Sequence, residues 1–215
     1  MIIYGSSMSP FVRKVLAYAA EKGIEVELVP VGIGDPNSEF RAASPFAKMP
    51  ALRDGDFTLA DSSAIIHYLE AKQPDPPLIP TDPRERGRAI WFEEWADSML
   101  FACGRKMFFN RVVAPRFLGR EGDLQAAATA ERDELPPLFD YLEGVIPDSN
   151  YLVGDRLTIA DLGVASPFAN FAHCGATVDA ARYPKVAAYT GAILGRPSFQ
   201  RWVELETAFL ARQAA

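Results

Sequence analysis

The sequence predicts two parts of different fold class: an α/β part with a mixed sheet, followed by an all-helical part. Three observations support this prediction. Residues 2–71 alternate between strand-like and helical patterns, residues 73–83 hold five prolines, and from residue 84 onward the apolar spacing is helical throughout. With 215 residues, the chain is long enough to bury a sizeable core without disulfides.

Composition and charge exclude several classes of protein. The chain is 49% hydrophobic and 23% charged, which is typical of a globular protein, and no stretch approaches the ~18 apolar residues of a membrane span. The N-terminus reads directly into a strand, so we expect no signal peptide. The net charge of −6 comes without a basic tail, which argues against a nucleic-acid partner. Two cysteines and two histidines do not form a zinc set, so we expect no metal and a cytoplasmic location.

The first part opens with the apolar run Ile2–Tyr4, which predicts a strand. Apolar residues then recur at helical spacing over residues 10–22, and Gly23 is a typical helix stop. The alternating apolar residues of 26–31 predict a second strand, and a short helix is expected around Phe40.

A tight hairpin is expected next, because Asp54-Gly55-Asp56 separates the strand-like segments 51–53 and 57–59. A helix over residues 62–71 completes this part. A strand–helix–strand unit followed by a hairpin and a helix predicts a mixed sheet of about four strands covered by helices.

The proline-rich segment 73–83 predicts the domain boundary, because proline stiffens an extended chain. The first domain is then expected to cover residues 1–72 and the second to cover residues 84–215. These bounds place the strand patterns in the first domain.

The second domain is predicted to begin with one long helix over residues 84–113, ended by Pro115. A second helix over 124–145 is expected to bend or restart at Pro136-Pro137. Further helices are expected at residues 158–174, 184–194 and 198–212.

Ser9 and Pro10 stand at the first strand-to-helix turn. A serine before a proline at the first helical position is a common helix cap. The same position also puts a hydroxyl at the C-terminal edge of the sheet, beside helix N–H groups that favour an anion such as a thiolate. The pattern alone leaves both roles open.

Two further motifs pose a similar choice. A trans Met49-Pro50 bond would only start a strand, whereas a cis bond would turn the Met49 peptide outward to pair with an extended peptide ligand. Asp61-Ser62 begins a helix, where it either caps the helix or binds a ligand carboxylate and ammonium.

A fourth motif receives a structural interpretation. Thr158 and Asp161 have the spacing of a capping box, and Leu157 with Leu162 would make the hydrophobic staple that accompanies it. We therefore expect this segment to start a buried helix and to matter for folding.

In this order and spacing, the four motifs resemble the cytosolic glutathione S-transferases over both domains. The resemblance rests on Ser9-Pro10-Phe11 with Arg13, Lys48 to Leu52, Asp61 to Leu69, and Gly154 to Leu162. The stretch Trp91–Phe108 is similar to the first long helix of plant tau-type and related bacterial members. The resemblance implies a thioredoxin-like α/β N-terminal domain that holds glutathione and an all-α C-terminal domain that completes the cleft.

Ser9 matches the family's serine that donates a hydrogen bond to the glutathione sulfur. Such a bond stabilises the thiolate and lowers a thiol pKa from ~8.5 toward neutrality. Because position 9 is neither Tyr nor Cys, conjugation or peroxide chemistry is favoured over disulfide reduction. Ser6 and Ser7 stand close enough in the sequence to compete for this role or assist in it.

The resemblance also assigns the residues that hold glutathione, the co-substrate. Lys48 would reach the glycyl carboxylate, and the backbone of Met49, before a cis Pro50, would pair with the cysteinyl part. Asp61 and Ser62 would hold the γ-glutamyl group, although many members carry the longer Glu at the position of Asp61.

A small hydrophobic electrophile is expected as the second substrate. Phe101, Arg105 and Phe108 fall on one helical face and match positions that line this site in tau-type members. Phe11 would form the floor and contact glutathione. The alternative is that Phe101 and Phe108 are core residues, but Arg105 favours the binding site because an unpaired charge in a core is costly.

The resemblance implies a detoxifying glutathione transferase that acts in the cytoplasm as a homodimer, with no nucleic-acid or membrane partner. One alternative is a glutathione-dependent isomerase, ether-cleaving or dehalogenating enzyme of the same family. Another is a non-catalytic ligand-binding or interaction protein of the same fold. The Ser-Ser-Cys pattern of the zeta-type isomerases is absent, because Met8 interrupts the serine run.

Overall fold

The computed structural model describes residues 1–213. The chain divides into two compact units, Met1–Ile79 and Pro80–Ala215, and all strands among the described residues belong to the first unit. The division falls inside the predicted linker, and residues 73–79 group with the first unit. The predicted order of an α/β part followed by a helical part is confirmed.

The first unit is built on a four-stranded mixed sheet in the order β2-β1-β3-β4. Strand β1 (Ile2–Gly5) pairs in parallel with β2 (Glu27–Pro30) and antiparallel with β3 (Ala51–Asp54). β3 forms a hairpin with β4 (Phe57–Ala60), and the turn contains Gly55 at φ +64°, a left-handed conformation that favours glycine.

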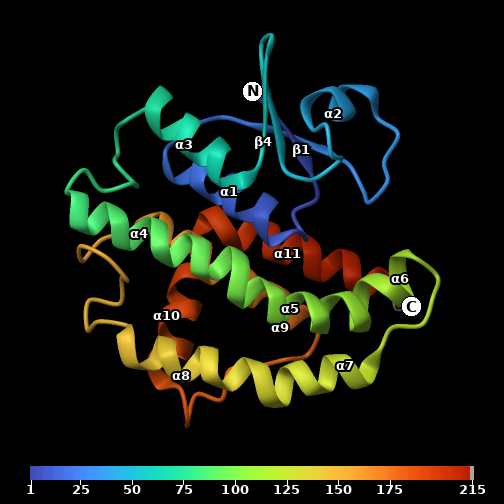
Figure 1. Cartoon of the computed structure of the whole chain (residues 1–215), viewed down its shortest axis with the longest axis vertical. Helices are drawn as coiled ribbons and strands as arrows, with labels where there is room; N and C mark the ends of the chain where they lie inside the picture. The colour runs from blue at the N-terminus through green and yellow to red at the C-terminus, as the bar shows by residue number, and fades with distance from the viewer. Residues whose placement is uncertain (214–215) are drawn as a thin grey trace. The chain divides into compact units, whose positions relative to one another are not determined.

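Helices cover both faces of this sheet. Side chains of one parity, including Tyr4 and Ala51, pack with helix α2 (Ser38–Ala43). The opposite parity faces helices α1 (Pro10–Glu21) and α3 (Ser62–Lys72), which lie side by side (Figure 1).

Two glycines determine where α1 begins and ends. A Cβ on Gly5 would lie 2.5 Å from a methyl carbon of Val12, so glycine lets the first turn of α1 approach the end of β1. Gly23 has φ +66° and donates its N–H to the carbonyl of Ala20 at 3.0 Å, which confirms the predicted helix stop.

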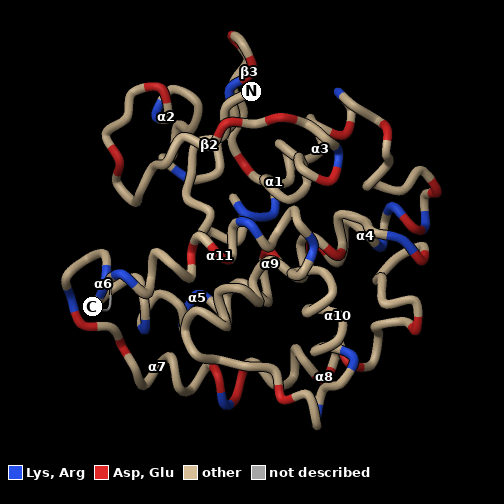
Figure 2. Tube along the Cα trace, turned by 180° about the vertical axis from the view of Figure 1, so that it is seen from behind, with Lys and Arg blue, Asp and Glu red and all other residues tan. Residues whose placement is uncertain are grey.

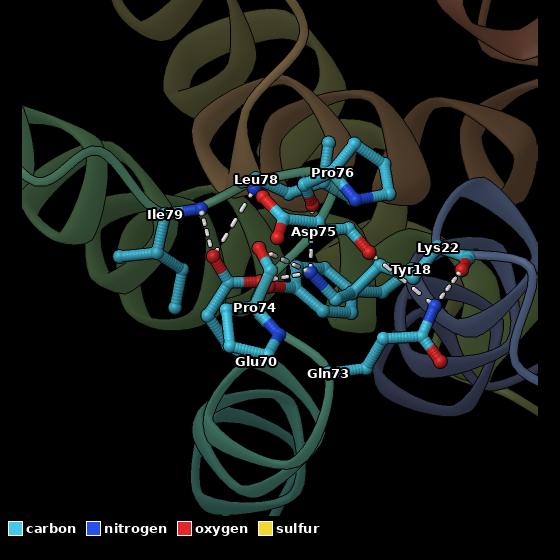
Figure 3. Close-up of polar contacts among 9 residues, drawn as sticks. All are labelled: Tyr18, Lys22, Glu70, Gln73, Pro74, Asp75, Pro76, Leu78 and Ile79. Atoms are coloured by element: carbon cyan, nitrogen blue, oxygen red, sulfur yellow. Dashed lines mark hydrogen bonds and ion pairs between the residues drawn. The ribbon is translucent and has the colours of Figure 1, made fainter.

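A buried ion pair ties the segment after α3 to the first unit (Figure 3). Lys22 Nζ donates to Glu70 Oε2 at 2.5 Å and to the carbonyl of Pro76 at 2.7 Å. Glu70 Oε1 accepts the N–H groups of Leu78 and Ile79 at 3.2 and 3.1 Å. Because Lys22 and Glu70 both bind backbone groups of the segment 73–79, this segment is anchored to the ends of α1 and α3.

The second unit is organised around helix α9 (Ile159–His173), in which every residue from Ile159 to Phe171 is buried. Helices α4 (Pro83–Trp95), α5 (Phe101–Phe108) and α10 (Pro184–Leu194) pack against α9. Helix α11 (Pro197–Arg212) packs against α10.

The first long helix continues past its predicted end. The helical path runs from α4 through the π-helical turns η1 (Ala96–Leu100) and η2 (Phe109–Val113) to α6 (Ala114–Phe117). The prediction that Pro115 ends this helix is wrong, because Pro115 stands in the first turn of α6, directly after η2, where its missing N–H is tolerated.

The second long helix restarts where its prolines predict. Helix α7 (Leu124–Thr129) passes through the π-helical turn η3 (Ala130–Glu134) into α8 (Leu135–Val145). The pair Pro136-Pro137 stands in the first turn of α8, so the predicted restart is confirmed.

The start of α4 is a solvated segment with charges of both signs (Figure 2). Arg84, Arg86 and Arg88 are exposed, and Asp82 caps the helix by accepting N–H groups of its first turn. Glu85 forms an ion pair with Arg156, with 3.2 Å between the carboxylate oxygen and the guanidinium nitrogen. Charges of both signs therefore offset one another here.

Candidate active site

The strand register brings three motifs to one end of the sheet in the first unit. It pairs Tyr4 of β1 with Ala51 of β3, and Ala51 with Ala60 of β4. Strands β1 and β4 end at this edge, and β3 begins there. The segments that follow β1 and β4 and the segment that precedes β3 therefore lie together. Those segments contain Ser9, Met49-Pro50 and Asp61-Ser62.

Ser9 begins α1 without acting as a side-chain cap. Its backbone N–H donates to the carbonyl of Ser6 at 2.9 Å, and its carbonyl accepts the N–H of Arg13 at 2.9 Å. Within residues 1–213, its side chain forms no capping hydrogen bond, and Pro10 has no N–H to be capped. The structure therefore does not show side-chain capping, which is one of the two roles considered for Ser9.

The beginning of α1 also favours an anion by its charge. The first turn of the helix contains no acidic residue, so the positive end of the helix dipole is not offset there. Phe11 in this turn is half-buried, and Lys14 Nζ lies 5.8 Å from the centre of its ring. A half-buried hydroxyl, helix N–H groups and an aromatic ring thus occupy a single turn.

The peptide bond between Met49 and Pro50 is cis. Of the two isomers considered from the sequence, this is the one that the family resemblance implies. Pairing of β3 with β1 starts at Ala51, so the Met49 peptide lies just outside the ladder. Lys48 is exposed, Met49 is half-buried and Pro50 is buried.

Ser44 shapes the loop that leads to this peptide, and sequence reasoning did not identify it. Its hydroxyl accepts the N–H of Lys48 at 2.9 Å and donates to the carbonyl of Lys48 at 2.7 Å. Ser44 is 1% exposed, and the intervening Ala47 takes a left-handed φ of +51°. A single serine four residues upstream carries no pattern that would distinguish it from other loop serines.

Asp61 caps α3 and takes an unusual backbone conformation. Its Oδ1 accepts the N–H groups of Ser63 and Ala64, each at 3.0 Å. Its φ of +83° is rare outside glycine and costs of order 1–3 kcal/mol, and such residues cluster at functional sites. The side chain is exposed while Ser62 is 4% exposed. Asp61 therefore caps α3 as predicted, and both capping bonds go to the same carboxylate oxygen, Oδ1.

The three residues predicted to bind the electrophile lie in the second unit, on one face of α5. Phe101 and Phe108 are half-buried, and Arg105 is exposed. The buried side of the same helix consists of Cys103, Gly104 and Met107. The two phenylalanines are therefore not the core residues of this helix.

Among residues 1–213, no group of three or more His, Cys, Asp or Glu residues is arranged to hold a metal ion, and no helix has the length and hydrophobicity to cross a membrane. Both cysteines are buried, and burial raises the pKa of the Cys103 thiol to about 11. Cys103 is thus not a nucleophile near neutral pH.

Comparison with known families matches both units. Residues 3–77 match the model for the glutathione S-transferase N-terminal domain. Residues 108–206 match the model for the glutathione S-transferase C-terminal domain. The first match includes all the candidate glutathione-binding residues.

Individual proteins are similar over nearly the whole chain. A glutathione S-transferase of Hyoscyamus muticus is 35% identical over 213 residues, which cover 95% of this chain and 98% of that protein. Maleylacetoacetate isomerase of Rattus norvegicus is 31% identical, with 92% of this chain and 88% of that protein covered. The structure of glutathione S-transferase I from maize, in complex with an atrazine glutathione conjugate, superimposes with a TM-score of 0.83 at 26% identity, covering 95% of this chain and 96% of that one.

Proposed function

Because the chain belongs to the glutathione S-transferase family and is an enzyme that transfers glutathione, we propose that Ser9 is the residue that activates the glutathione sulfur. One observation carries this proposal: the Ser9 side chain makes no capping bond at a helix start that lies at the same sheet edge as the cis Met49-Pro50 peptide. A serine whose function was capping would accept an N–H of the first turn.

In this mechanism Ser9 acts as a hydrogen-bond donor and not as a base. Its hydroxyl donates to the thiolate, and the positive end of the α1 dipole adds to the stabilisation, so the thiol releases its proton to solvent nearer neutral pH. The sulfur then forms a bond to the electrophilic carbon, and a leaving group departs with the electron pair of the bond that breaks.

The other residues of the edge would hold the rest of glutathione. Lys48 offers an exposed ammonium to the glycyl carboxylate, and the Met49 backbone lies where an extended cysteinyl peptide can pair with it. Asp61 faces the γ-glutamyl ammonium, and Ser62 at the positive end of the α3 dipole receives the γ-glutamyl carboxylate. Phe11 contacts glutathione from the first turn of α1.

The second substrate is a small hydrophobic electrophile. Phe101 and Phe108 offer two aromatic surfaces on the less buried face of α5, and Arg105 between them offers a cation to a polar or anionic leaving group.

The same family membership supports a cytoplasmic homodimer. Phe46, on the loop between α2 and β3, is 85% exposed, which is consistent with a protein contact. Sedimentation of the pure protein should show a dimer at micromolar concentration, and a monomer throughout that range would contradict the proposal. The variant Phe46→Ala should weaken the dimer without changing the fold.

Replacing Ser9 by alanine tests the catalytic proposal. The variant should lose about 2–4 kcal/mol of transition-state stabilisation, by analogy with the loss of one oxyanion donor. The measured quantity is the turnover of 1-chloro-2,4-dinitrobenzene with glutathione, which should fall accordingly. Ser7→Ala is the matched control, because it removes a hydroxyl from the same turn, and its rate should be unchanged. A loss below about tenfold in Ser9→Ala would assign the role to another serine or to a backbone N–H.

One relative favours a second candidate, a glutathione-dependent isomerase. The similarity to the rat maleylacetoacetate isomerase extends over 92% of this chain. Against it, the Ser-Ser-Cys pattern is interrupted by Met8. An assay with maleylacetoacetate separates the two candidates: isomerisation faster than conjugation of any aryl chloride would favour the isomerase. Rates at the uncatalysed level in both assays, with glutathione still bound, would favour a binding protein.

A further inference from the structure

Ser44 is fixed to the core of the first unit. It follows α2 directly, and its backbone N–H donates to the carbonyl of Phe40 at 2.8 Å. Phe40 and Ala43 are buried in the cluster that also contains Tyr4 and Ala51 of the sheet. Because α2 is held against the sheet in this way, the buried side chain of Ser44 has a fixed place from which to hold the following loop.

The Ser44 hydroxyl holds both backbone polar groups of Lys48. It accepts the N–H of Lys48 at 2.9 Å and donates to the Lys48 carbonyl at 2.7 Å. Within the same loop, the N–H of Ala47 donates to the carbonyl of Ser44 at 2.9 Å. Three hydrogen bonds thus close the loop and fix the Lys48 backbone, while the Lys48 side chain is exposed.

These bonds also determine the direction of the next N–H group. The peptide bond between Lys48 and Met49 is trans, and in a trans peptide the C=O and the N–H point in opposite directions. Because the Lys48 carbonyl points toward the Ser44 hydroxyl, the Met49 N–H points away from it. The Met49 peptide lies just outside the ladder between β3 and β1, whose pairing starts at Ala51. The Met49 N–H is therefore aimed in a defined direction outside the ladder.

We propose that Ser44 is a positioning residue for glutathione: its hydroxyl aims the Met49 N–H at the cysteinyl carbonyl and holds Lys48 beside the glycyl carboxylate. This inference rests on the proposed glutathione site, which belongs to the first unit. Ser44 does not touch glutathione, because it acts through the peptide group between Lys48 and Met49. A donor that is already oriented loses less freedom on binding, so removing the hydroxyl weakens the affinity for glutathione.

The first test measures glutathione binding to Ser44→Ala by titration calorimetry. The Kd should rise about tenfold, which corresponds to the loss of about one hydrogen bond in binding free energy. The kcat at saturating glutathione should be unchanged, because Ser9 lies on a different segment. Asn37→Ala is the matched control: it removes a bond of 2.9 Å to the N–H of Phe40 at the other end of α2, and its Kd should stay at the wild-type value.

A second thiol shows whether the effect is specific to this end of glutathione. γ-Glutamylcysteamine lacks the cysteinyl carbonyl and the glycine, so it offers no partner to the Met49 N–H or to Lys48. Ser44→Ala should lower kcat/KM for glutathione about tenfold and change that for γ-glutamylcysteamine by less than about twofold. Equal losses on the two thiols would show a general disturbance of the fold and would overturn the inference, as would an unchanged Kd for glutathione.

A second variant keeps the test decisive if Ser44→Ala folds poorly. Ser44→Cys nearly keeps the size of the side chain but replaces the hydroxyl by a weaker donor and acceptor. The Kd for glutathione should then rise about threefold, with kcat/KM for γ-glutamylcysteamine again unchanged. A wild type with the same kcat/KM for both thiols would contradict the proposed contacts of Lys48 and Met49 themselves, a failure of the proposed function that is detected without any Ser44 variant.

Discussion

Among the aspartates that accept backbone hydrogen bonds at helix starts, Asp161 in the first turn of α9 and Asp61 before α3 lie in opposite environments. Asp161 of α9 is 0% exposed and accepts bonds from the N–H of Leu152 at 2.9 Å, the N–H of Thr158 at 2.8 Å and the hydroxyl of Tyr189 at 3.2 Å. Asp61 of α3 is exposed, and its two capping bonds both go to Oδ1.

The difference shows how to separate a folding residue from a ligand-binding one. The donors around Asp161 all come from its own unit and include side-chain and backbone groups of three segments, so this carboxylate already has its partners. Asp61 stands at a sheet edge beside two other family motifs, with an unusual φ and an exposed side chain. Local sequence alone would class both residues as helix caps.

Alanine at Asp161 should give the largest effect. It removes the acceptor of several buried donors at once, so the free energy of unfolding should fall by about 3–5 kcal/mol. Urea unfolding followed by circular dichroism measures this loss. The KM for glutathione, determined on the remaining folded enzyme, should be unchanged.

Asp61→Ala is the matched comparison, since it makes the same substitution at the other helix start. Losing an exposed cap should lower the free energy of unfolding by only about 1 kcal/mol. The KM for glutathione should rise. Equal stability losses in the two variants would remove the distinction between the two aspartates.

Much of the fold follows from local pattern, and the exceptions have identifiable causes. The mixed sheet, the hairpin at Asp54-Gly55-Asp56 and the capping box at Thr158 and Asp161 are confirmed because each depends on residues close in sequence. The continuation of the helix through Pro115 was not predicted, because π-helical turns leave no composition signal.

The candidate site was predictable in part. The residues of the sheet edge carry recognisable motifs, whereas the two bonds between Ser44 and the Lys48 backbone leave no pattern in the sequence. The anchoring of residues 73–79 is another case, because Lys22 is 54 residues before Pro76, whose carbonyl it binds. Such partners become evident only once the fold places them together.

The pH dependence of stability should be smaller than the loss of stability in Asp161→Ala. Burial raises the pKa of Asp161 to about 6, although its hydrogen bonds oppose the shift. Because the folded state then binds this proton more tightly than the unfolded state does, Asp161 stabilises the fold most below about pH 4, and this stabilisation declines as the pH rises to 6.

Asp161→Asn isolates this contribution, since asparagine is uncharged at every pH. The difference in unfolding free energy between wild type and variant should therefore fall by about 2 kcal/mol from pH 4 to pH 7. A difference that grew with pH would mean that the hydrogen bonds outweigh burial and hold the pKa of Asp161 in the folded protein below its value in the unfolded chain.

The smallest expected effect is the most specific to the glutathione site. Asparagine at Asp61 keeps an oxygen for the N–H groups of Ser63 and Ala64 and tolerates a left-handed φ, so stability should change by less than about 0.5 kcal/mol. It loses the charge that faces the γ-glutamyl ammonium, so the KM for glutathione should rise about five- to tenfold with kcat unchanged. A glutathione analogue that lacks this amino group is the control, because wild type and variant should then have the same KM. If the variant bound both peptides as the wild type does, Asp61 would be a helix cap alone, and the two aspartates would differ in burial but not in role.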